Sequence, residues 1–207
     1  MRHRTKAVLV AVGASLCMLA VVSTASANRL SVTEHEFRAV FNNLQAQTDS
    51  GYFITCNVTI EGSLVGRTIA KTVGSLAGRI TRATVGTCSQ NSLIILPESL
   101  PWHLTYVGFT GTLPAINLVN ANVIGAEIRG SVFGLGCLGT STAESPLRFE
   151  FRREAGGRVV EVRANNTFRI PVGGFGCIGE TDEANLAGGG EVFVLGSTTT
   201  RITLSLV

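Results

Sequence analysis

The clearest structural signal in this sequence is the segment Tyr52-Phe53-Ile54-Thr55-Cys56-Asn57-Val58-Thr59-Ile60-Glu61. Its even-numbered residues are apolar, and all but the first of the odd-numbered residues that alternate with them are polar. Successive side chains of a β-strand point to opposite faces of the sheet, so this alternation predicts a strand with one buried face. Cys56 belongs to the buried set. The stretch therefore predicts a half-buried strand that carries a cysteine toward the core.

The same alternation recurs along the chain. It is clear at residues 147–152, 160–163, 168–172 and 202–206, and weaker at 102–109, 122–132 and 191–195. Gly156-Gly157 lies between two of these segments and predicts a tight hairpin, because glycine adopts the positive φ angles of such turns. Short strands with one polar face predict an all-β fold. We expect an antiparallel two-sheet sandwich, Greek-key or Ig/jelly-roll-like, with at most short helices.

Two segments, 33–46 and 67–83, have patterns that fit more than one structure. The first places Phe37, Phe41 and Leu44 at helical spacing, yet it can also be drawn as a strand. In the second, the apolar spacing also fits a helix, but Gly74 and Gly78 would each cost that helix about 1 kcal/mol. Helix and strand both remain open for these segments.

Residues 1–27 have the three parts of an export signal. A positively charged start is followed by an apolar run of about 16 residues and by the small-x-small cleavage site Ala25-Ser26-Ala27. The apolar run is shorter than the roughly 20 residues that a membrane-spanning helix needs. We expect cleavage before Asn28 and secretion of a single β domain, residues 28–207, without a membrane span.

Charge limits the partners of this domain. The export signal holds three of the 17 Lys and Arg residues and none of the 14 acidic residues, so the secreted domain carries 14 charges of each sign. Attraction to nucleic acid or to anionic lipid requires an excess of positive charge. We therefore expect neither partner. The expected partner is an extracellular ligand or a component of the cell envelope.

The residues after the export signal include four cysteines: Cys56, Cys88, Cys137 and Cys177. An even number of cysteines suits disulfides in an oxidising compartment. We favour Cys56–Cys88 and Cys137–Cys177, because neighbouring pairs close the shorter loops and because 134–139 and 174–179 share the pattern Gly-x-Gly-Cys-aliphatic-Gly. Each bond would restrict the unfolded chain by roughly 4 kcal/mol. Structural zinc sites use closely spaced cysteine pairs, which this chain lacks.

One segment around the single tryptophan is a candidate binding site. In Leu100-Pro101-Trp102-His103-Leu104-Thr105-Tyr106, an aromatic patch of Trp102, His103 and Tyr106 would suit a sugar or an aromatic ligand. The alternative, which we favour, is a strand whose buried face carries Trp102, Leu104 and Tyr106 and whose outer face carries His103.

We assign no catalytic residue from the sequence. A hydrolase triad needs a base beside its nucleophile, and the secreted domain has only His35 and His103 and no Gly-x-Ser-x-Gly element. A glycosidase pair among the 14 acidic residues remains open. Glu127, Glu150 and Glu161, however, alternate outward near arginines, a pattern typical of surface ion pairs.

The only acidic cluster is Glu180-Thr181-Asp182-Glu183. Carboxylates can bind calcium, but the spacing of known calcium loops is missing. We interpret the cluster as part of a solvated loop that ends at Gly188-Gly189-Gly190. We expect no metal and no cofactor.

Several segments resemble a group of secreted proteins of actinobacteria. The resemblance rests on Cys56-Asn57-Val58-Thr59-Ile60-Glu61-Gly62-Ser63, Arg67-Thr68-Ile69-Ala70-Lys71, Leu100-Pro101-Trp102-His103 and Phe109-Thr110-Gly111-Thr112-Leu113-Pro114. It covers most of the chain after residue 27. It implies an exported β-protein from a Gram-positive bacterium of high GC content. It implies no activity, ligand or catalytic residue.

Taken together, the sequence predicts a secreted, non-enzymatic β-protein that acts as an extracellular or envelope-associated structural or binding module. Two alternatives remain. One is a secreted carbohydrate-active hydrolase with a scattered carboxylate pair, which a concave pocket lined by two acids would favour. The other is a small-ligand carrier or inhibitor with an apolar cleft near Trp102.

Overall fold

The alternating segments fold into β-strands throughout the described part of the chain. The structure is a computed structural model that describes residues 29–49, 51, 53–89, 92–112, 115–132, 135–165, 169–173 and 182–206. The expected export signal, residues 1–27, lies outside this part. No helix in the described residues has the length and apolar character needed to cross a membrane.

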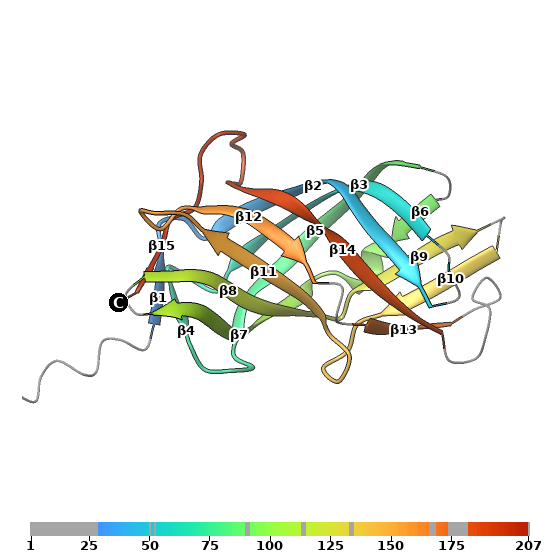
Figure 1. Cartoon of the computed structure of the whole chain (residues 1–207), viewed down its shortest axis with the longest axis horizontal. Helices are drawn as coiled ribbons and strands as arrows, with labels where there is room; N and C mark the ends of the chain where they lie inside the picture. Colours follow the sequence, from blue (N-terminus) through green and yellow to red (C-terminus); the bar gives the residue numbers. More distant parts are fainter. Residues whose placement is uncertain are drawn as a thin grey trace, which may run out of the picture.

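Eight antiparallel strands close into a ring (Figure 1). They follow one another in the hydrogen-bonding order β12, β11, β8, β7, β5, β3, β2 and β14, and β14 then pairs with β12. Their bounds are β2 (Glu36–Thr48), β3 (Phe53–Leu64), β5 (Leu76–Cys88), β7 (Trp102–Thr112), β8 (Ala115–Ile124), β11 (Leu147–Arg153), β12 (Val159–Ala164) and β14 (Asp182–Val194). Cross-strand hydrogen bonds therefore run all the way around the ring.

Opposite walls of the ring pack against each other as two layers. Phe41 on β2 and Phe149 on β11 are almost fully buried, and their ring centroids lie 5.8 Å apart across the interior. The apolar residues of the segment with which the sequence analysis began all face this core: Ile54, Cys56, Val58 and Ile60. The expected antiparallel, two-layer, all-β architecture is confirmed. The only helix described is a single 3-10 turn, η1 (Pro97–Ser99).

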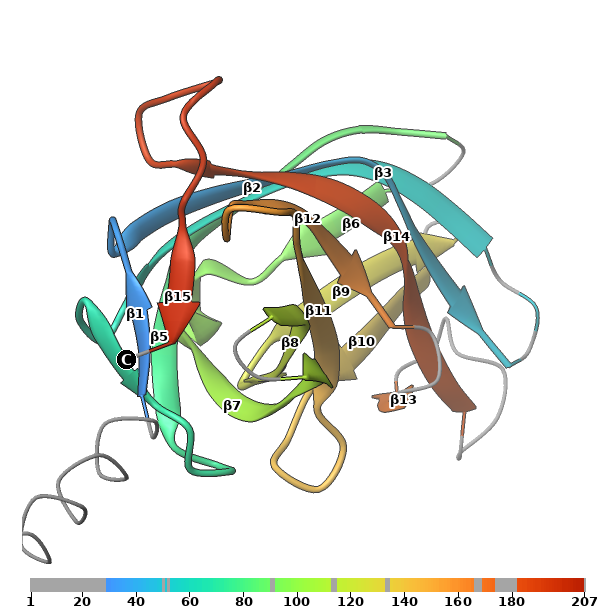
Figure 2. The same cartoon turned by 60° about the vertical axis from the view of Figure 1, so that its left-hand side comes forward.

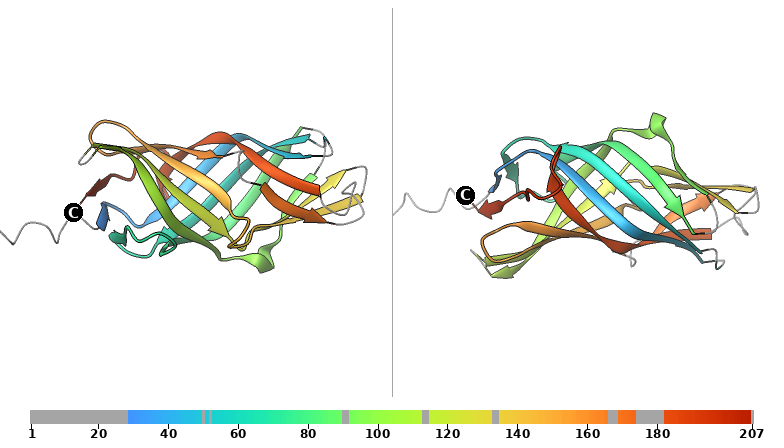
Figure 3. Two further views of the ribbon diagram at one scale, coloured as in Figure 1. Left: turned by 60° about the horizontal axis from the view of Figure 1, so that its bottom comes forward. Right: turned by 90° about the horizontal axis from the view of Figure 1, so that it is seen from above.

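Four further strands extend the sheet beyond the ring. They form the wing: β6 (Ser92–Ile95), β9 (Glu127–Val132), β10 (Leu135–Thr140) and β13 (Arg169–Gly173). The wing joins the ring at β14, whose residues 182–185 pair with β13 while residues 188–191 pair with β12. We call this change of partner the fork. The two views of Figure 3 show the wing strands at the end of the molecule opposite the C-terminus.

A buried serine holds the corner where β8 turns into β9. Ser141 is 1% exposed, and its hydroxyl accepts a hydrogen bond of 2.9 Å from the backbone N–H of Ala126. The backbone N–H of Ser141 donates to the carbonyl of Ala126, and its carbonyl accepts from Gly125. Gly125 has a φ of 85°, which glycine adopts without strain. Three hydrogen bonds thus fix the direction in which the wing leaves the ring.

A small sheet covers the other end of the ring (Figure 2). This cap consists of β1 (Arg29–Val32), β4 (Thr68–Ala70) and β15 (Leu204–Leu206), with β1 in the centre. Leu30 of β1 pairs with Ile69 and with Leu206, so strands from both ends of the described chain meet here. The cap is joined to the ring by the hydrogen bonds Val159 N–H to Ile202 O and Leu204 N–H to Gly157 O, both 2.8 Å.

The segments that fitted either helix or strand are strands with irregularities. The first is most of β2, and the second contains β4 and the first part of β5. In β2 the pairing register shifts between Phe41 and Leu44. Because of this irregularity, the buried apolar residues of the strand have the sequence spacing that is typical of a helix. The predicted hairpin at Gly156-Gly157 is confirmed, with φ angles of 84° and 85°.

The prediction of a loop from the acidic cluster to Gly188-Gly189-Gly190 was wrong over residues 182–190, which belong to β14. Glu180 and Thr181 lie outside the described residues. Gly188 and Gly190 are in the strand because the backbone of the neighbouring strand β2 approaches closely there. A Cβ at Gly190 would lie 2.7 Å from the carbonyl oxygen of Val40 and 2.9 Å from the Phe41 ring.

Candidate functional site

The three residues of the predicted aromatic patch do not share a surface. Trp102 and Tyr106 are each 3% exposed and face the core, whereas His103 is exposed on the other face of β7. The indole N–H of Trp102 donates 2.9 Å to the hydroxyl of Ser99, which itself donates 2.7 Å to the carbonyl of Leu96. Trp102 therefore fixes the 3-10 turn to the core. Burial also raises the pKa of the Tyr106 hydroxyl.

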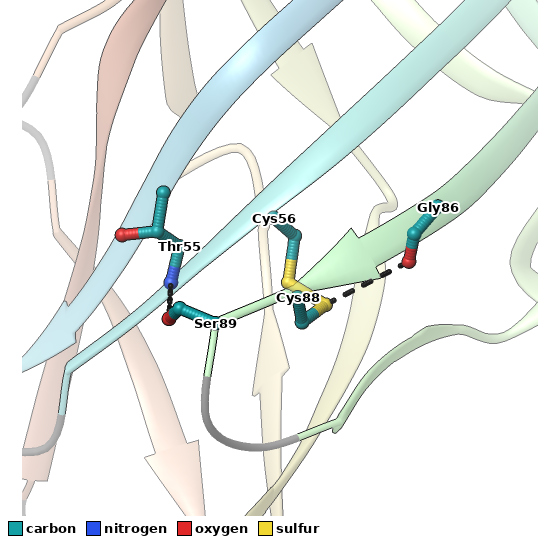
Figure 4. The surroundings of a disulfide bond; sticks show 5 residues. All are labelled: Thr55, Cys56, Gly86, Cys88 and Ser89. Atoms are coloured by element: carbon teal, nitrogen blue, oxygen red, sulfur yellow. Dashed lines mark hydrogen bonds between the residues drawn. A yellow bond between two sulfur atoms is a disulfide. The ribbon is translucent and has the colours of Figure 1, made fainter.

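The predicted disulfide between Cys56 and Cys88 is present (Figure 4). The two residues lie directly opposite each other on β3 and β5, with Cα atoms 4.1 Å apart. Thr55 and Ser89 flank the bond: the Ser89 N–H donates 2.9 Å to the Thr55 carbonyl, and the Thr55 N–H donates 3.3 Å to the Ser89 hydroxyl. The disulfide therefore cross-links the last pair of residues in the β3–β5 ladder.

Cys137 is also disulfide-bonded. Its predicted partner, Cys177, lies outside the described residues. Cys137 is in β10, which pairs with β13 at Leu138 and Gly173, shortly before Cys177 in the chain.

A polar concavity lies on the outer face of the ring, beside the fork. This outer groove has a volume of about 510 Å³ and is lined by Glu150, Glu161, Arg163, Ala164, Asn165, Ala187, Gly188 and Gly189. Its polar side chains come from β11, from β12 and from the residue that follows β12. Its floor comes from β14, where alanine and glycine replace larger side chains. The groove depends on the pairing of β12 with β14.

Two arginines hold Glu161 in the outer groove. One carboxylate oxygen lies 2.6 Å from Arg163 Nε, and the other lies 3.3 Å from Arg152 Nη1. The hydrogen bond and charge of Arg163, with a smaller contribution from Arg152, lower the pKa of Glu161, and partial burial opposes this only in part. The same contact raises the pKa of Arg163. The Glu161 carboxylate therefore stays ionised at pH values below the usual pKa range of a glutamate.

The second carboxylate of the groove, Glu150, accepts a short hydrogen bond from the side-chain amide of Asn165. The groove thus offers hydrogen-bond acceptors on Glu150 and Glu161 and donors on Arg163 and Asn165. The sequence identified Glu150 and Glu161 as outward-facing residues near arginines, but it gave no sign that they line one groove. The missing information is the strand pairing across the fork.

Among the described residues, no group of three or more His, Cys, Asp or Glu side chains is arranged to hold a metal ion. No protein-family model, curated protein or solved structure matches the chain. Fold and site together define a disulfide-bonded, all-β protein with a polar groove on its outer surface.

Proposed function

We propose that this protein is a secreted, non-enzymatic binding module of the extracellular space or cell envelope, and that the outer groove is its ligand site. The observation that carries the proposal is the pre-arranged set of donors and acceptors around Glu161. A cross-strand contact to Arg152 on β11 and a contact to Arg163, two residues along β12, hold its carboxylate on a closed ring, so little order would be lost when a ligand binds. The export pattern of residues 1–27 and the Cys56–Cys88 disulfide support an extracellular location.

The chemistry of the groove favours a neutral ligand rich in hydroxyl groups, such as a carbohydrate chain. Two carboxylates and two arginines, counting Arg152, nearly cancel in charge, so the groove would not attract a strongly charged ligand. A sugar hydroxyl both donates and accepts hydrogen bonds, and the groove supplies both kinds of partner. The small residues of the floor allow one face of a sugar ring to approach the backbone.

Co-sedimentation with cellulose, chitin and purified peptidoglycan tests the proposal, with alginate as an acidic competitor. We expect the wild type to bind at least one of the three solids, with alginate competing poorly. Arg163→Ala should weaken this binding. The matched control is Arg82→Ala, because Arg82 makes a similar exposed contact to Glu61 on another wall of the ring, 3.5 Å long. Equal loss of binding in both variants, or binding to none of the solids, would refute the groove as the ligand site.

A second candidate function is the carbohydrate-active hydrolase. Glu150 and Glu161 line the same groove, and glycosidases use a pair of carboxylates. One acid of such a pair must stay protonated to donate to the leaving group, and the lowered pKa of Glu161 does not suit that role. Measuring reducing-sugar release in the same incubations distinguishes the two functions. Release that Glu150→Gln or Glu161→Gln abolishes would replace the binding module with the hydrolase.

A further inference from the structure

A second concavity lies inside the ring, directly beneath the cap. This inner cavity has a volume of about 70 Å³, and no polar atom faces it. The cap contributes Leu30, Val32, Ile69 and Leu204 to its lining, and Ile202 in the segment just before β15 adds a fifth side chain. The ring walls contribute the rest, including Leu104, Tyr106 and Ala121.

The cavity arises from small side chains at inward-facing positions of one wall. Ala121 on β8 lies directly opposite Tyr106 on β7, and Ala77 on β5 lies on the other side of β7. Both alanines are buried, at 3% and 6% exposure, and both line the cavity. Valine or isoleucine at these strand positions would fill part of the space. Unfilled volume in a core lowers stability in proportion to its size, so the chain keeps a void that a simple substitution would remove.

The chemistry of the lining decides what can occupy this void. A water molecule needs two to four polar partners, and the cavity supplies none. Apolar cavities of this kind stay dry and take up small apolar molecules. We propose that the inner cavity is a binding site for a hydrocarbon group, either a small free molecule or the end of an acyl chain. This site is separate from the outer groove and does not depend on the function proposed for it.

The cap provides the route of entry. It is made from strands near the two ends of the described chain and from the three-residue β4, and it lies outside the closed ring. A shift of the cap would break contacts such as those of Ile202 and Leu204 with the ring, but it would leave every ladder of the ring in place. The ring can therefore stay folded while the hydrocarbon enters.

Methyl NMR of the full domain, residues 28–207, tests the proposal with two probes, dissolved xenon and sodium dodecanoate. Xenon should shift the methyl signals of Ala121, Val119 and Leu104 in a saturable way. Shifts with xenon alone would support a site for small free molecules. If dodecanoate shifts the same signals and those of Leu30 and Ile202, the ligand is an acyl chain. If neither probe shifts the lining methyl groups, the proposal is wrong.

A cavity-filling variant identifies the site. Ala121→Val adds two methyl groups inside the cavity and should weaken binding of either probe by about tenfold or more. Ala83→Val is the matched control, because Ala83 on β5 is half-buried and does not line the cavity. Ala77→Val serves as a second filling variant if Ala121→Val does not fold. Binding of the probes by a folded filling variant with wild-type affinity would overturn the proposal, as would equal loss in Ala83→Val.

Discussion

The guanidinium of Arg201 forms an ion pair of 2.6 Å with Glu191 at the place where β12 and β14 separate. Glu191 is in the last register in which these two strands pair. Just beyond it, Arg201 Nη1 donates to the carbonyls of Val192, at 2.8 Å, and Val160, at 3.3 Å. Arg201 also lies 4.0 Å from the ring centroid of Phe193, which is only 8% exposed although it is not part of the core cluster. One side chain thus continues the ladder between β12 and β14 and covers an outward-facing aromatic ring.

Replacing Arg201 should therefore destabilise the closure of the ring. We expect Arg201→Ala to lower the free energy of unfolding by about 1–3 kcal/mol, because two carbonyls lose a charged donor. Arg201→Lys is the control: it keeps the charge beside Glu191 but lacks the planar group that reaches both carbonyls. Urea denaturation should place Arg201→Lys between the wild type and Arg201→Ala. A lysine variant as stable as the wild type would show that only the charge matters.

Ser141 should be the most sensitive polar residue of the corner between ring and wing. Ser141→Ala leaves the buried N–H of Ala126 without its hydroxyl partner, and we expect a loss of about 1–3 kcal/mol in stability. Ser205→Ala is the control, since Ser205 is exposed on β15. Thermal unfolding followed by circular dichroism measures both. Equal melting temperatures for the two variants would contradict the role of Ser141.

Removing the Cys56–Cys88 disulfide should lower stability by about 4 kcal/mol, because the unfolded chain gains the freedom of the loop between the two residues. The double variant Cys56→Ala/Cys88→Ala avoids a free thiol, and urea denaturation of the oxidised proteins gives the difference. Peptide mapping of the exported wild type should in addition find an N-terminus at Asn28 and a Cys137–Cys177 peptide. Unchanged urea midpoints would refute the stabilising role, and another partner for Cys137 would refute the second pairing.

Gly190 should not tolerate even a methyl group. The added Cβ would lie 2.7 Å from the carbonyl oxygen of Val40, a backbone atom that cannot move without disturbing β2. We expect Gly190→Ala to cost about 1–3 kcal/mol in stability. Gly108→Ala is the matched control, because a Cβ at Gly108 would have no neighbour within 4 Å. If chemical denaturation finds both variants alike, the close approach of β2 and β14 does not limit the side chain at position 190.

Lowering the pH should remove the contribution of Glu161 to the stability of the folded protein. Arg163 and Arg152 lower its pKa in the folded protein, so Glu161 adds stability above the ordinary pKa of a glutamate and loses this contribution as the pH falls through the lowered value. The stability difference between the wild type and Glu161→Gln should therefore be largest near neutral pH and vanish in acid. Urea denaturation from pH 7 to pH 2 measures it. A difference that stays constant over this range would contradict the assignment.

The sequence predicted the parts of the fold that depend on neighbouring residues. Alternation from Ile54 to Ile60 gave the strand and its buried face, and paired glycines gave the hairpin at 156–157. Prediction from the sequence failed where the alternation of apolar and polar residues breaks. The register shift after Phe41 produced the spacing of a helix. The glycines of β14 resembled a loop, because the close approach of β2 to Gly188 and Gly190 comes from a strand that is distant in sequence.

The sequence predicted an all-β chain and favoured a disulfide between Cys56 and Cys88, which the structure contains. Both predictions rest on local properties, since burial alternates between adjacent residues and neighbouring cysteines close the shorter loops. The closure of the strands into a ring and the change of partner of β14 at the fork became evident only in the folded structure. Both features depend on hydrogen bonds between residues far apart in the chain, and every polar edge of a strand can in principle pair with any other. The outer groove and the inner cavity follow from that closure, so neither could be located before the strand order was known.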